Sequence, residues 1–208
     1  MRLGGRIQAA IEVMEDVQNR RRPISEALKD WGLAHRFAGS GDRAFIGNLA
    51  YDALRWRAST RWIMDSDKAS SLIFGTVVYR WNQSWQELET TFDGDKFAPP
   101  LPGKSKREAA DARRLSDAPE WIQADLPKWL VPHFQSNFSD EWIAEAQALS
   151  GRPPLDLRVN TLKSDRGTEL TALQSLGAEL TDISSTGLRI QPSDGARRHP
   201  NVQLVRWL

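Results

Sequence analysis

The sequence contains no cysteine, which excludes disulfide bonds, a thiolate nucleophile and cysteine-ligated zinc or iron–sulfur sites. Its three histidines, His35, His133 and His199, lie far apart, and none stands in a spacing typical of metal ligands. The longest apolar stretch, residues 72–79, is far shorter than the ~20 residues that a membrane span needs. Residues 1–7 carry charge but are not followed by the apolar segment of a secretion signal. We therefore expect no metal, no membrane partner and a cytoplasmic location.

A net charge of one sign is also lacking, because 28 Lys and Arg stand against 27 Asp and Glu. The total charge therefore points to neither a nucleic acid nor a membrane, and such a partner has to be inferred from local clusters. The chain has 208 residues, of which 40% are apolar and 26% charged, as in an ordinary globular protein of one large or two small domains. Nine tryptophans predict wide packed surfaces and also favour interfaces.

Apolar residues recur at the helical period through the first ninety residues. A first helix around residues 7–17 ends at Arg20–Arg22, and a second begins after Pro23 and stops at Gly32. A third begins near Gly41 and Asp42. Further helices are expected at about Thr60–Met64, Lys68–Trp81 and Ser84–Phe92. The apolar stretch at residues 72–79 has the composition of a strand, but its helical surroundings favour a buried helix.

The rest of the chain divides into three parts. Residues 93–117 are rich in Pro, Gly and charge, which predicts a flexible loop or insertion. Helical patterning returns in residues 118–152 and predicts a bridge of three short helices. Residues 153–208 are expected to form a small β-α-β-β unit. The predicted fold class is therefore mainly α: a helical domain at residues 1–92, completed by the bridge and followed by an α+β subdomain.

The small unit is predicted from a change of period. Residues 155–160 alternate apolar and polar side chains, as a half-buried strand does. A helical stripe of leucines follows and ends at Gly177. Residues 180–183 and 188–190 are expected to form two more short strands.

Two glycine-containing segments resemble nucleotide-binding loops. Residues 39–44, GSGDRA, fit the dinucleotide pattern G-x-G-x-x-[GA], but that pattern needs a strand before it and residues 32–37 show no β alternation. Residues 103–105, GKS, resemble the end of a P-loop, yet nearby prolines remove backbone donors that would hold phosphate. We interpret the first as a turn that caps the third helix and the second as a solvated loop. No cofactor site is expected in this chain.

Basic and aromatic residues cluster in the first third of the chain. Residues 1–62 contain eleven Lys and Arg against seven Asp and Glu, with Trp56 and Trp62 interleaved among arginines. Arginine pairs with phosphate and stacks on unpaired bases, which suits folded RNA. The alternative is solubilising charge on amphipathic helices, and charge alone favours that alternative.

Residues 42–57, DRAFIGNLAYDALRWR, resemble the DR-x-F-x-x-x-L-x-Y-x-x-L-R segment of the NusB-like domain that opens the Sun/RsmB-type (Fmu) ribosomal RNA cytosine-5 methyltransferases. Residues 153–163, PPLDLRVNTLK, resemble the P-P-L-x-L-R-V-N-x-L-K strand that begins the small RNA-binding subdomain of the same family. Residues 119–130 are similar to the family's P-x-W-L helices. The resemblance covers nearly the whole chain, with Asp52 at a position that is often glycine in the family.

The resemblance implies RNA as the partner, 16S ribosomal RNA above all. In the family a further domain binds S-adenosylmethionine and supplies a cysteine that attacks the cytosine and a second one for product release. Cytosine C5 is not nucleophilic until such a thiolate adds, so a chain without cysteine cannot run that mechanism. We therefore expect the RNA-recognition part of such an enzyme, not catalytic by itself, as a truncated product, a frameshifted gene product or one half of a split protein.

The resemblance places RNA contacts on six residues: Arg43, Arg55, Arg57, Arg158, Asn160 and Lys163. Structural roles compete with each assignment. Arg43 and Arg55 can bridge helices through Asp52 or another carboxylate, and Asn160 can cap the corner after its strand. If a catalytic domain is missing, one face of the small sheet should be uncovered, which predicts self-association through an apolar patch near Leu188, Ile190 and Trp207.

Two other functions stay open. A stand-alone NusB-like module would bind RNA, as in antitermination, or a partner protein, but it should end near residue 150. A complete enzyme with an unrecognised site is the third possibility, although the sequence offers no nucleophile, metal set or cofactor loop.

Overall fold

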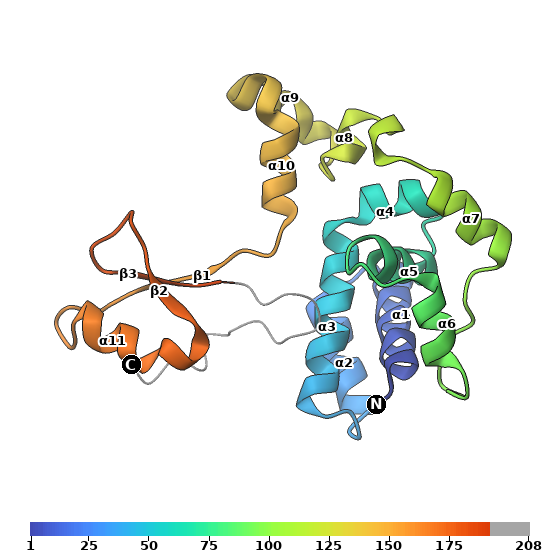
Figure 1. The fold of residues 1–208 in the computed structure, drawn as a ribbon, viewed down its shortest axis with the longest axis horizontal. Coiled ribbons are helices and arrows are strands. Elements are labelled where there is room, and N and C mark those ends of the chain that lie inside the picture. The colour runs from blue at the N-terminus through green and yellow to red at the C-terminus, as the bar shows by residue number, and fades with distance from the viewer. Residues whose placement is uncertain (192–208) are drawn as a thin grey trace. The chain divides into compact units, whose positions relative to one another are not determined.

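A computed structural model of the chain describes residues 1–191 (Figure 1). The chain divides into two compact units, a helical unit at Met1–Gly151 and a smaller unit that begins at Arg152. Each unit has its own hydrophobic core. The mainly α fold with a small α+β subdomain that the sequence predicts is confirmed.

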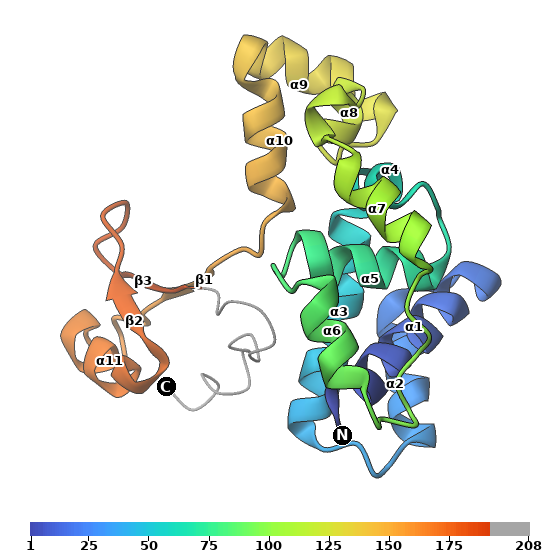
Figure 2. The ribbon, with the colours of Figure 1, turned by 45° about the vertical axis from the view of Figure 1, so that its right-hand side comes forward.

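The helical unit begins with seven α-helices and continues with three short ones (Figures 1 and 2). The first seven are α1 (Leu3–Arg20), α2 (Ile24–Ala34), α3 (Ser40–Arg55), α4 (Arg57–Met64), α5 (Ala69–Tyr79), α6 (Trp85–Phe92) and α7 (Lys104–Ala112). The three short ones are α8 (Glu120–Gln123), α9 (Val131–Phe138) and α10 (Trp142–Ser150).

The main core lies where α1, α3 and α5 meet. The apolar stripes of α1 and α3 are buried, which confirms both predicted helices. In α5, Leu72, Ile73 and Phe74 are at most 1% exposed. A helix that is apolar around most of its circumference has to be buried on most sides, and α5 packs against α1, α3 and α4. The stretch with strand-like composition is therefore a buried helix, as the sequence predicts.

Two expectations for the helical unit are wrong. Gly32 does not end α2, which continues to Ala34; the guanidinium of Arg43 lies where a side chain at position 32 would project. Residues 93–117 are not a loop throughout, because Lys104–Ala112 form α7 and Ala110 is buried in the main core. The GKS segment accordingly begins a helix instead of a solvated loop.

The bridge forms a small core of its own. Ala124, Leu126, Trp142 and Ala146 are buried together, and side chains of α9 pack around them. The three short helices expected here are present, with the 3-10 turn Lys128–Leu130 leading into α9.

The second unit contains β1 (Leu155–Arg158), α11 (Arg166–Ala172), β2 (Ala178–Leu180) and β3 (Gly187–Ile190). The sheet is antiparallel in the order β1-β3-β2, which confirms the β-α-β-β unit. One sheet face is apolar, and its Leu188 packs with Leu173 at the end of α11. The other face carries the alternate residues Asp156, Arg158 and Arg189.

The sequence predicts an exposed apolar patch on the sheet, and this prediction is wrong for two of the three residues named. Leu188 and Ile190 are each 1% exposed, because they point to the covered face of the sheet. Trp207 lies outside the described residues. Strand β2 ends at Leu180, so Ile183 belongs to the following turn and is 91% exposed.

A buried carboxylate fixes the start of α3. Asp42 is 8% exposed and accepts hydrogen bonds from Arg6 Nε at 2.7 Å, the Met1 amine at 3.1 Å and the Gly39 backbone N–H at 3.1 Å. Burial alone raises the pKa of Asp42, but these three donors outweigh burial and lower the pKa below its ordinary value. Asp42 therefore joins the amino terminus of α1 to the first turn of α3.

We predict that Asp42→Asn lowers the free energy of unfolding at pH 7 by about 2 kcal/mol, because hydrogen bonds to a charged group are lost. Since the folded pKa is lowered, the wild-type contribution is present above the pKa of the unfolded aspartate, about 3.9, and is lost as the pH falls through the folded pKa. Urea unfolding at pH 7 and at about pH 3 measures this. The difference between the two proteins should be smaller in acid; a constant difference would contradict the assignment.

Candidate nucleic-acid interface

Arg43 has a structural position. Its guanidinium donates to the carbonyl oxygens of Ala38 at 2.9 Å and Gly32 at 2.7 Å, near the end of α2. Carbonyl groups at a helix C-terminus lack intrahelical partners, and a cation satisfies them well. Arg43 therefore joins α2 to α3 through backbone carbonyls, and not through a carboxylate as the structural alternative proposed.

Arg55 and Arg57 lie at the junction of α3 and α4. Arg55 is 3.9 Å from the carboxylate of Asp52, which is 1% exposed and also accepts a hydrogen bond from Trp81 Nε1 at 2.9 Å. This hydrogen bond gives Asp52 a structural role in the helical unit. Arg57 forms a two-bond ion pair with Asp67, at 3.0 and 2.6 Å.

Both arginines line an open cleft of about 1150 Å³, which we call the α4 cleft. Its lining residues come from the stretch 54–67, from Arg113 just after α7 and from the stretch 121–128 of the bridge, and we call the first and the last of these stretches its two walls. The positively charged lining residues are Arg55, Arg57, Arg61, Arg113 and Lys128, and the aromatic ones are Trp62 and Trp121. The structure thus brings two of the predicted RNA contacts together, whereas Arg43 is not among the lining residues.

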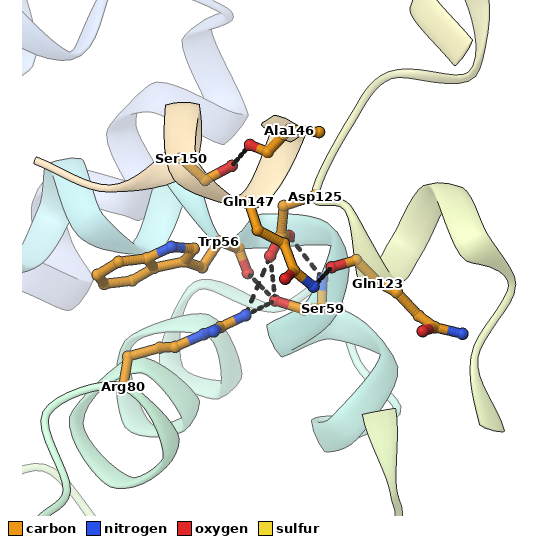
Figure 3. A network of polar contacts seen from close by, with 8 residues as sticks. All are labelled: Trp56, Ser59, Arg80, Gln123, Asp125, Ala146, Gln147 and Ser150. Carbon is orange, nitrogen blue, oxygen red and sulfur yellow. Dashed lines mark hydrogen bonds and ion pairs between the residues drawn. The ribbon is translucent and has the colours of Figure 1, made fainter. Parts of the chain in front are cut away.

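Asp125 connects the two walls of the α4 cleft (Figure 3). The first backbone N–H groups of a helix have no intrahelical acceptor, and Trp56, which precedes α4, offers no side-chain cap. Asp125, a residue of the bridge, supplies this acceptor. Its carboxylate accepts hydrogen bonds from the Ser59 backbone N–H at 2.8 Å and from the Ser59 hydroxyl at 2.5 Å. A carboxylate here also suits the positive end of the α4 dipole. The amino-terminal turn of α4 is therefore capped by a residue of the bridge.

Arg80 completes this network (Figure 3). It donates to Asp125 Oδ2 at 3.1 Å and to Ser59 Oγ at 2.6 Å, and its guanidinium lies 5.2 Å from the ring centre of Trp56. Burial raises the pKa of Asp125, although the hydrogen bonds from Ser59 and the positive charge of Arg80 act to lower it. Burial lowers the pKa of Arg80, although the negative charge of Asp125 acts to raise it. Both charges are thus costly to bury and depend on each other.

Two further contacts hold α4 in place. A Cβ at Gly75 would lie 2.5 Å from Thr60 Cγ2, so only glycine lets α5 approach α4 this closely. At the other end, Arg113 donates to the Trp62 carbonyl at 2.7 Å and pairs with Asp65 at 2.8 Å. The wall that carries Arg57, Arg61 and Trp62 is therefore fixed at its start, its middle and its end.

The far wall of the cleft is not predicted by the sequence. Arg113 falls in the segment with the composition of a loop, and Trp121 and Lys128 fall in the predicted bridge helices. The adjacent Lys128 and Trp129 repeat the basic–aromatic pattern seen in the first third of the chain. That repetition is the one signal in the sequence that relates the bridge to this cluster.

The second unit carries the other three predicted contacts around the end of β1. Arg158 faces Gly187 across the sheet, so no neighbouring side chain pairs with it, whereas Arg189 is held by Asp156 at 2.7 and 2.8 Å. Within residues 1–191 the side chains of Arg158 and Lys163 have no hydrogen bond or ion pair, and both are exposed.

Asn160 forms the corner after β1. Its side-chain oxygen accepts the Leu162 backbone N–H at 3.1 Å, and its carbonyl accepts the Lys163 N–H at 2.9 Å. This is the structural alternative predicted for Asn160. The corner holds the backbone of Lys163 close to the end of β1, and Asn160 itself is exposed.

Arg166, which is not among the predicted RNA contacts, has a structural role. Its guanidinium donates to the carbonyls of Thr181 at 2.6 Å and Gly187 at 2.9 Å. It therefore joins the first residue of α11 to Thr181 in the turn after β2 and to Gly187 at the start of β3.

The residues that resemble a dinucleotide loop do not fit a cofactor. Helix α2 precedes them where the motif needs a strand, and the Gly39 N–H donates to Asp42 instead of facing outward. The interpretation as a turn that begins α3 is confirmed. In the part of the chain that the structure describes, no cluster of His, Asp or Glu could hold a metal ion, and no helix is long and apolar enough to span a membrane.

Comparison with known proteins gives a partial match. Residues 126–193 match the family model of the Methyltr_RsmF/B-like, ferredoxin-like domain, over less than half of the chain. No curated protein matches. A solved structure entitled "Crystal Structure of PH0851" is similar at 17% identity with a TM-score of 0.43; the match covers 93% of this chain and 50% of that one. The chain thus spans half the length of that structure. The domain match supports the relation to Sun/RsmB-type methyltransferases that the motifs indicate.

We predict that Asp125→Ala lowers the free energy of unfolding by about 3 kcal/mol, because it leaves Arg80 buried without its partner and the start of α4 without its cap. Urea unfolding followed by circular dichroism measures the loss. Asp140→Ala removes an exposed carboxylate of the same bridge and should cost less than about 0.5 kcal/mol. Equal effects of the two substitutions would contradict the capping role.

Proposed function

We propose that this chain is the RNA-recognition portion of an S-adenosylmethionine-dependent ribosomal RNA (cytosine-5) methyltransferase and does not transfer methyl groups by itself. The match of residues 126–193 to the RsmF/B-like domain supports the proposal. The motifs at residues 42–57 and 153–163 add to it, because they stand in the order that the related family has. RNA, and 16S ribosomal RNA in particular, is the proposed partner.

The observation that carries the proposal is the unpaired positive charge at the end of β1. On the open face of the sheet Arg189 is neutralised by Asp156, but Arg158 stands opposite a glycine. Lys163 follows on the loop, also exposed and unpaired among the described residues. Two free cations beside an exposed amide group are suited to a phosphate backbone and an adjacent base edge. Because the match includes this strand, we assign the contact to RNA.

The absence of cysteine supports a role in recognition alone. Methyl transfer to cytosine C5 requires a nucleophile that first adds to the ring, and this chain has no thiol to supply it. We therefore assign no catalytic residue. The role of the chain would be to hold RNA while the chemistry takes place on another domain or chain.

We predict that Arg158→Ala/Lys163→Ala weakens binding of a labelled 16S ribosomal RNA transcript at least about ten-fold at low salt, since two phosphate contacts are lost. The slope of log affinity against log salt should become shallower by about 2. Fluorescence anisotropy between about 50 and 200 mM KCl measures both quantities.

The matched control is Asp156→Ala/Arg189→Ala, which removes a neutral pair from the same sheet face and keeps the net charge unchanged. This control should bind the transcript as the wild type does. Salt-independent binding by the wild type, no binding at low salt, or equal effects of the two double variants would contradict the proposal.

A further inference from the structure

We propose that the α4 cleft is a second RNA-binding site of this chain, which takes an unpaired RNA segment with its phosphates at Arg61 and Lys128 and its bases against Trp62 and Trp121. This inference rests on the proposed function, because it takes RNA as the partner. It assigns a separate site, built entirely by residues of the helical unit.

The charges in the cleft leave a positive excess. Each of the three lining aspartates already has a cation: Asp67 pairs with Arg57, Asp65 with Arg113 and Asp125 with Arg80. Arg61 and Lys128 have no carboxylate partner among residues 1–191, and both line the cleft, Arg61 from α4 and Lys128 from the bridge.

Arg55 also lines the cleft, but its guanidinium lies 3.9 Å from the buried carboxylate of Asp52, so its charge does not add to the excess. An anion in the cleft would meet the free charge of Arg61 from α4 and of Lys128 from the bridge, and a phosphodiester supplies that anion.

The tryptophans give the cleft its preference for bases. Trp62 from α4 and Trp121 from α8 are partly exposed and line the same space. Arg113 lies 5.9 Å from the ring centre of Trp62, and Lys128 lies 4.9 Å from that of Trp121. Aromatic rings beside cations are the arrangement that binds single strands, where bases stack on rings and phosphates pair with cations. In a duplex the bases are already stacked on each other, so these rings favour an unpaired segment.

The size and rigidity of the cleft suit a short polymer. Its volume of about 1150 Å³ exceeds the range of about 300 to 1,000 Å³ typical of small-molecule sites. Its walls are fixed before any ligand arrives, by Asp125 at the start of α4 and by Gly75 behind it. Binding therefore does not have to order the walls, which reduces its entropic cost.

The test uses a labelled single-stranded RNA of mixed sequence, about 12 nucleotides long, and its duplex form, with anisotropy at about 50 mM KCl. We expect Arg61→Ala/Lys128→Ala to weaken binding of the single strand at least about ten-fold. Lys104→Ala/Lys106→Ala removes the same charge from exposed positions of α7 outside the cleft and should change binding less than about two-fold. Both lysines and both cleft cations are exposed, and circular dichroism checks that all variants fold.

A second pair of variants tests stacking. Trp121→Leu should weaken binding of the single strand about ten-fold, and Trp121→Phe should retain most of it, because a phenyl ring still stacks. The duplex should bind more weakly than the single strand and should not respond to Trp121→Leu. Equal effects of the cleft and α7 variants, or preference for the duplex, would overturn the cleft site.

The two proposals fail separately. If Arg61→Ala/Lys128→Ala binds the single strand as the wild type does while Arg158→Ala/Lys163→Ala loses the transcript, the cleft site is wrong and the proposed function stands. If the cleft variants lose the single strand and the sheet variants keep the transcript, the cleft site stands and the assignment to β1 is wrong. Absence of RNA binding by the wild type would overturn both.

Discussion

The helical unit depends on one contact across a long stretch of sequence, the carboxylate of Asp125 on the first turn of α4. Helix α4 has only eight residues and no side-chain cap of its own, so its free N–H groups need an acceptor from elsewhere. Asp125 supplies it 66 residues later in the chain and brings Arg80 as counter-charge. Because the same residue begins the segment that leads to Lys128, the contact that stabilises α4 also sets the distance between the two walls of the α4 cleft.

The two units present positive charge in different ways. In the helical unit many arginines are committed to structural contacts: Arg43 holds α2, Arg57 pairs with Asp67, and Arg113 holds the end of α4. In the second unit the register of the sheet decides which arginine forms an ion pair. It places Arg189 opposite Asp156 and Arg158 opposite a glycine. The proposed RNA contacts include cations that these networks leave without a carboxylate partner, such as Arg61, Arg158 and Lys163. A count of basic residues alone would not distinguish them.

Local patterns predicted the elements but not the contacts between them. The helical period of α1 and α3, the alternation of β1 and the glycine after α11 each depend on neighbouring residues, so the sequence contains them directly. Helix α7 was missed because its charged sequence has a single buried residue, Ala110, to mark it. The α4 cleft could not be predicted, because it is assembled from α4, the end of α7 and the bridge. For the same reason the roles of Arg43 and Asp125 became visible only in the structure.

The most direct test of this account is the exchange rate of the Ser59 amide hydrogen, measured by NMR in the wild type and in Asp125→Ala. If Asp125 caps α4, the substitution should lower the protection of Ser59 at least about ten-fold, while the amide of Ile11 in α1 changes much less. An unchanged rate at Ser59 would contradict the account, because α4 would then hold its position, and the cleft its wall, without the bridge.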